Sequence, residues 1–72
     1  MEELWESLDY WHIRLNRSLS REDLRTLVRT VFSGAGEIVN HRGDLDYMVA
    51  VPSGTPVHGD REDLAGCSLI DA

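Results

Sequence analysis

A chain of 72 residues is enough for one small domain, and its 42% hydrophobic and 28% charged residues are typical of a globular protein. The net charge of −6 disfavours binding to nucleic acid, and the single cysteine excludes an intrachain disulfide. No apolar run approaches the roughly 20 residues that cross a bilayer, and no secretory signal pattern is visible. We therefore expect a single small α+β domain over residues 1–72 that is soluble and cytoplasmic.

The N-terminal part of the chain contains two different patterns. Residues 1–9 alternate apolar and acidic residues at helical spacing, which predicts one or two turns of amphipathic helix. In the next seven residues, Trp11, Ile13 and Leu15 alternate with polar residues, as in a half-buried strand. A helix there would leave Tyr10 and Ile13 on the wrong face. We favour a strand over residues 10–16, and the alternative is a helix.

Residues 20–32 carry the strongest local signal, which predicts the main helix. Its apolar residues recur at helical spacing and share one face; they are Leu24, Leu27, Val28, Val31 and Phe32. Ser20 is a good N-cap, with Asp23 three positions later as in a capping box. The glycines of residues 33–36 can adopt the left-handed conformation that ends a helix.

The remaining sequence predicts two further strands. Residues 37–41 form a short strand, residues 40–44 form a turn around Gly43, and residues 45–51 alternate as a second strand. Residues 53–72 are expected to be a loop-rich C-terminal segment. Within it we expect one helical turn at residues 60–66, followed by an edge strand or a docked tail at residues 67–70.

The predicted fold is α+β, with a short N-terminal helix followed by a β-α-β-β series. The main helix packs on a small antiparallel or mixed sheet, because a two-stranded hairpin is marginal without further packing. If residues 10–16 are helical, the alternative is a helical hairpin packed on a β-hairpin.

One stretch resembles a known family. Val51-Pro52-Ser53, followed by Pro56 and by Asp63-Leu64, is similar to part of a small accessory domain of the phenylalanyl-tRNA synthetase β subunit. The resemblance covers residues 19–64 loosely and implies a β-α-β-β arrangement. The arginine expected soon after Val-Pro-Ser is absent, because Gly54-Thr55 stands there. We therefore assign no family.

The residues that could carry chemistry do not form a recognisable motif. The set His12, His41, His58 and Cys67 could bind zinc, but no two of these residues have the paired spacing of a metal site. His58, Asp60 and Cys67 could form a nucleophilic site, but they lie in a Gly-containing segment that offers little preorganisation. We expect no enzymatic activity, no catalytic residues, no metal and no cofactor.

Charge and aromatic residues point instead to protein binding. Trp5, Tyr10 and Trp11 are large rings beside the most acidic stretch of the chain, and we expect at least one of them to be exposed. The expected partner-binding residues are Glu3, Trp5, Glu6, Asp9, Tyr10, Asp44 and Asp46. The alternative site is a basic strip of five arginines: Arg14, Arg17, Arg21, Arg25 and Arg29.

The leading hypothesis is a small, acidic, non-enzymatic protein-interaction module. It would occupy a basic surface of a nucleic-acid-binding partner, as inhibitors of the anti-CRISPR-like kind encoded by phages and mobile elements do. Membrane binding and direct nucleic-acid binding are not expected, and a homodimer is compatible with this hypothesis. The alternative is a small nucleic-acid-binding or regulatory domain that uses the Arg14–Arg29 strip.

Overall fold

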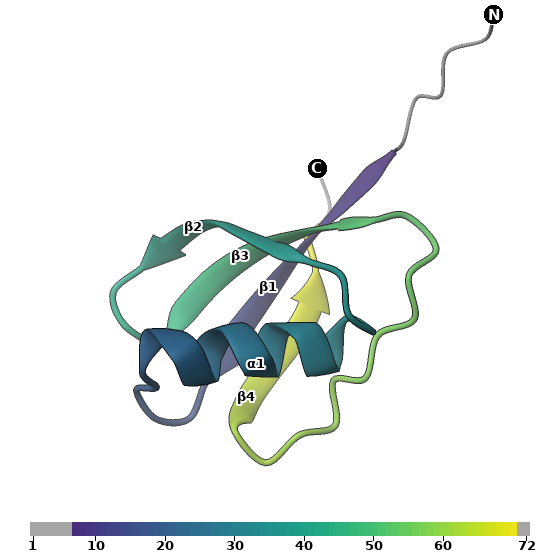
Figure 1. Ribbon diagram of the computed structural model, residues 1–72. Helices are drawn as coiled ribbons and strands as arrows, with labels where there is room; N and C mark the ends of the chain where they lie inside the picture. The colour runs from purple at the N-terminus through teal and green to yellow at the C-terminus, as the bar shows by residue number, and fades with distance from the viewer. Residues whose placement is uncertain (1–6, 71–72) are drawn as a thin grey trace, which may run out of the picture.

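The computed structural model describes residues 7–70. Four strands form one sheet in the order β2-β3-β1-β4, with every neighbouring pair antiparallel, and a single helix lies against one face (Figure 1). The fold is therefore α+β, with one helix on a small antiparallel sheet. The elements are β1 (Leu8–Leu15), α1 (Arg21–Val31), β2 (Glu37–Arg42), β3 (Asp46–Pro52) and β4 (Leu64–Leu69).

The segment with the ambiguous period is a strand, and it lies at the centre of the sheet. β1 pairs with β3 on one side and with β4 on the other. Ile13 and Leu15 are 0% and 1% exposed, whereas Arg14 between them is exposed, as a period of two requires. The helical-hairpin alternative is therefore wrong. The helix expected at residues 1–9 falls largely outside the described residues, and its positions Leu8 and Asp9 belong to β1.

α1 begins and ends where the sequence indicates. The Ser20 hydroxyl accepts a hydrogen bond from the backbone N–H of Asp23 at 3.1 Å, which satisfies one of the free N–H groups of the first turn. After Phe32, Ser33 and Gly34 have φ values of +56° and +86°, and this left-handed backbone ends the helix.

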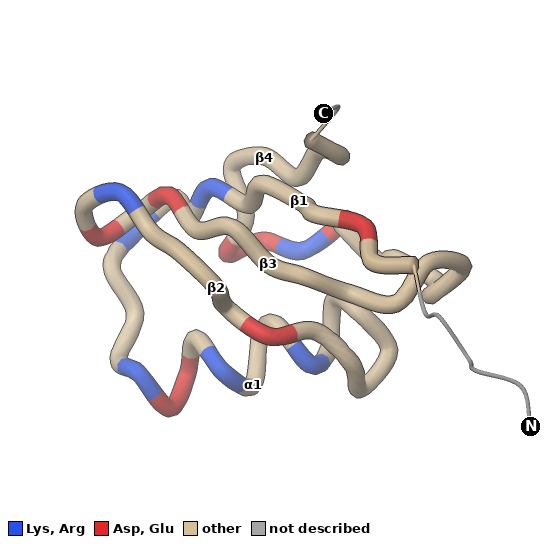
Figure 2. The backbone as a smooth tube through the Cα atoms, turned by 90° about the horizontal axis from the view of Figure 1, so that it is seen from above, with Lys and Arg blue, Asp and Glu red and all other residues tan. Residues whose placement is uncertain are grey.

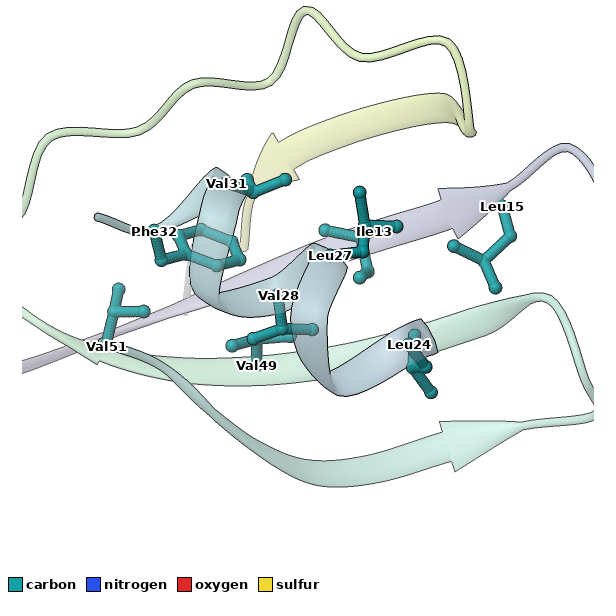
Figure 3. Close-up of a cluster of buried hydrophobic side chains, with 9 residues drawn as sticks. All are labelled: Ile13, Leu15, Leu24, Leu27, Val28, Val31, Phe32, Val49 and Val51. Atoms are coloured by element: carbon teal, nitrogen blue, oxygen red, sulfur yellow. The ribbon is translucent and has the colours of Figure 1, made fainter. Parts of the chain in front are cut away.

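The core lies between α1 and the sheet (Figure 3). α1 faces mainly the two central strands, and Trp11 packs against Phe32 with ring centroids 6.0 Å apart. The buried side chains are Ile13, Leu15, Leu24, Leu27, Val28, Val31, Phe32, Val49 and Val51. This cluster confirms the apolar face predicted for the helix.

The C-terminal segment differs in part from the expectation: the edge strand considered for residues 67–70 is present, but it spans Leu64–Leu69. The helical turn expected at residues 60–66 is not formed, because β4 begins at Leu64 and pairs with β1. The expected β-α-β-β series is therefore one strand shorter than the observed sheet. The loop before β4 is tied to the rest of the fold by backbone hydrogen bonds from His58 N–H to Val31 C=O (2.7 Å) and from Asn16 N–H to Asp63 C=O (3.1 Å).

α1 has only 11 residues. In the part of the chain that the structure describes, no helix combines the length and the apolar character needed to span a membrane.

Candidate functional site

α1 covers only one face of the sheet, and the opposite face, here called the open face, has no layer over it in the described residues (Figure 1). Residues that pair across neighbouring strands point to the same side, so the register identifies the open-face side chains. They are Leu8, Tyr10, His12 and Arg14 from β1, Glu37, Asn40 and Arg42 from β2, Asp46, Met48, Ala50 and Pro52 from β3, and Ser68 and Ile70 at β4.

A pair of titratable groups stands on the open face at one end of the β1–β3 pairing. His12 Nε2 lies 2.9 Å from Asp46 Oδ1, and Arg14 Nε lies 4.0 Å from the same oxygen. Arg42 is the cross-strand neighbour of Asp46 on the other side. The Asp46 carboxylate is thus surrounded by basic side chains. A shallow hollow of about 520 Å³ over these groups also takes in Met48 and Ile70.

The partner-binding residues expected from the sequence do not form one surface. Tyr10 and Asp46 share the open face, but they stand at opposite ends of the β1–β3 pairing. Asp44 is exposed in the β2–β3 turn. Asp9 points to the other side of β1 and accepts a hydrogen bond from the Ser53 hydroxyl at 3.1 Å. Glu3, Trp5 and Glu6 lie outside the described residues.

The expectation of an exposed ring is met by Tyr10, which is 42% exposed on the open face. Trp11, the next residue, is half-buried on the helix side of the sheet. The alternation of the strand is the reason, because adjacent residues point to opposite faces.

The five arginines of the expected basic strip are divided among three places (Figure 2). Arg14 lies on the open face, and Arg17 pairs with Asp63, with Nη2 and Oδ1 3.1 Å apart. Arg21, Arg25 and Arg29 follow one side of α1. Only the last three form a row.

This row borders a second surface, the α1–β2 groove, which sequence reasoning did not identify. The groove has a volume of about 990 Å³, with Leu24, Val28 and Ile38 along its length. Arg21, Arg25 and Arg29 line its helix side, while His41 and Asp44 line its strand side. The spacing of the arginines was a visible signal in the sequence, but the position of β2 beside α1 was not.

The two sheet histidines considered for metal binding have different partners. His12 bonds to Asp46, while His41 Nδ1 lies 3.1 Å from the Gly43 carbonyl oxygen. Between residues 7 and 70, no three His, Cys, Asp or Glu side chains come together as a metal-binding cluster. Burial raises the pKa of the Cys67 thiol, so less of the nucleophilic thiolate is present at neutral pH.

Comparison with protein-family models, with curated proteins and with solved structures finds no match to this chain. The loose likeness of residues 19–64 to the synthetase domain therefore carries no functional argument. Any functional conclusion must therefore come from the surfaces of the fold itself.

Proposed function

We propose that this chain is a non-enzymatic protein-interaction module that binds a partner protein through its open face. The observation that carries the proposal is the uncovered sheet face, where the exposed ring of Tyr10 lies with the half-buried Met48 and Ile70. Aromatic, methionine and arginine side chains are enriched in protein interfaces. The open face contains all three kinds, because Arg14 and Arg42 are also exposed there.

The charge of the fold modifies the kind of partner that we propose. Residues 7–70 contain nine acids and seven arginines, so the described domain is close to balanced. Most of the remaining acids are in residues 1–6. Attraction to a basic surface would therefore depend on that N-terminal segment, whereas the open face suits a partner of mixed charge with an apolar centre. The anti-CRISPR-like inhibitor role and the nucleic-acid-binding alternative stay predictions.

The test is comparative capture from the native host with three forms of the protein. Tyr10→Ala removes the exposed ring of the open face, while Thr26→Ala removes an exposed side chain of α1 as a matched control. We expect a partner that the parent and Thr26→Ala retain and that Tyr10→Ala loses. With the purified partner, calorimetry should show that Tyr10→Ala costs about 2 kcal/mol of binding free energy, as for a hot-spot aromatic residue.

Circular dichroism of each variant separates loss of binding from loss of folding. If folded Tyr10→Ala binds every recovered partner as tightly as the parent does, the open face is not the binding surface. Turnover of a substrate by the purified chain would contradict the non-enzymatic part of the proposal.

A further inference from the structure

We propose that the α1–β2 groove is a second binding site, which takes an extended peptide segment with a carboxylate side chain at every second position. The groove lies between the helix and the edge of the sheet, and its arginines are on α1 and not on the open face, although its lining extends to Ala50 of the open face. The proposal therefore does not depend on the function proposed above.

The groove exists because α1 does not cover the whole sheet. β2 is an edge strand, and the side chains of α1 pack mainly on the central strands β1 and β3 (Figure 3). α1 and β2 run in opposite directions along the two sides of the groove (Figures 1 and 3). Ile38 is half-buried on the strand side and Leu24 and Val28 are buried on the helix side, so the groove has an apolar component.

The arginines of the groove have charges that the described fold does not neutralise. Among residues 7–70, no carboxylate lies within ion-pair distance of Arg21, Arg25 or Arg29, whereas Arg14 and Arg17 each have an acidic neighbour. Asp44 also lines the groove, whereas the pairing of Glu37 with Ala50 points the Glu37 side chain to the open face. Three guanidinium groups thus outnumber one carboxylate, and a guanidinium group is well suited to bind a carboxylate through two hydrogen bonds.

The spacing of the arginines indicates the conformation of the ligand. Residues four apart on an α-helix are displaced by about 6 Å along its axis. Residues two apart on an extended strand are displaced by about 6.6–6.8 Å and point to the same side. Three carboxylates in the pattern acid-x-acid-x-acid would therefore meet Arg21, Arg25 and Arg29 in turn. A block of consecutive acids would place alternate side chains on the wrong side.

The free edge of β2 favours an extended ligand, because such a segment can lie beside the strand. Pairing along this edge is restricted, since the His41 N–H is bonded to Asn40 Oδ1 at 2.8 Å and the register with β3 shifts between Ile38 and Asn40. The arginines must then supply much of the affinity. Because all three are exposed, binding should weaken as salt is added.

A peptide is favoured over a nucleic acid by the surroundings of the arginine row. The chain carries a net charge of −6, and Asp44 lies within the groove itself. A continuous phosphate backbone would meet this repulsion. A short peptide can place an apolar or neutral residue opposite Asp44.

The test uses two synthetic fluorescent peptides of identical composition, each with three glutamates and three valines. One alternates glutamate and valine, and the other has the three glutamates in a block. Anisotropy titration of the full chain at low salt should show binding of the alternating peptide and at least about threefold weaker binding of the blocked peptide, since misplaced carboxylates lose one or more ion pairs. Raising the salt to a physiological level should weaken both.

Variants then locate the site. R25Q should weaken binding of the alternating peptide about threefold, and the triple variant R21Q/R25Q/R29Q about tenfold or more. D44N should strengthen binding, because it removes a competing carboxylate. R42Q, on the open face, is the matched control and should change nothing. All five positions are exposed, so folding should survive, and melting curves verify this.

The proposal is overturned if neither peptide binds at low salt, or if both bind equally. It is also overturned if the triple variant binds like the parent, or if an acidic helical peptide with glutamate at every fourth position binds more tightly. Tighter, arginine-dependent binding of single-stranded DNA would assign the groove to nucleic acid instead.

Discussion

At Gly36, which connects α1 to β2, the backbone has a φ of +98°. A Cβ at this position would lie 3.2 Å from a methyl carbon of Val28 and 3.2 Å from one of Val49. Both of these valines are buried in the core. The chain can therefore turn close over the core here only because glycine has no side chain.

Gly34 offers a matched comparison, because its φ of +86° is similar but a Cβ there would meet nothing within 4 Å. G34A should cost about 1–2 kcal/mol from backbone strain alone. G36A should cost about 1–3 kcal/mol more, since the valines must move. Urea denaturation of the two variants measures the difference. If G34A and G36A lose the same free energy of unfolding, the contacts of Val28 and Val49 do not restrict the size of the residue at position 36.

At the scale of elements, α1 depends on one apolar face and on its N-cap. L27A removes a side chain that is 8% exposed, and we expect a loss of about 2–4 kcal/mol in the free energy of unfolding. T26A, one residue earlier on the exposed side, should change it by no more than about 0.5 kcal/mol. Thermal and chemical unfolding of both variants provide the measurement. If L27A has the same free energy of unfolding as the parent, α1 contributes little to the stability of the core.

The strands should differ in stability according to their place in the sheet. β1 and β3 are paired on both sides, whereas β2 and β4 are the edges. Native-state hydrogen exchange should therefore be slowest at amides of the central strands that lie in the core, such as Ile13 and Val49, which are 0% exposed. The amides of β4 should exchange faster. Uniform protection across all four strands would indicate a single unfolding unit instead.

At the scale of the whole molecule, a small sheet with a single helix leaves large surfaces without intramolecular partners. The open face and the α1–β2 groove both arise in this way, one from the missing second layer and one from the incomplete cover by α1. A domain of this size buries only about 60% of the surface of its unfolded chain, so such surfaces are expected. Their side chains, rather than the fold class, must carry the function.

Patterns within short stretches of the sequence specify the local elements of this fold. The Ser20 cap, the apolar face of α1 and the alternation of residues 45–51 each depend on neighbours within a few positions, and each appears in the structure. The sequence also indicated that at least one of the neighbouring large rings is exposed, and in the structure Tyr10 is exposed.

The tertiary structure alone decided which segments became neighbours. The sequence Leu64–Leu69 contains alanine, glycine and serine and carries little strand signal, yet it forms β4 because it pairs with the free edge of β1. His12 and Asp46 are 34 positions apart and meet only through the β1–β3 register. The same register separates Arg14 from the arginines of α1. Periodicity shows which residues of a strand share a face. The order of the strands depends on pairing between segments that are distant in the sequence, and no local pattern encodes that order.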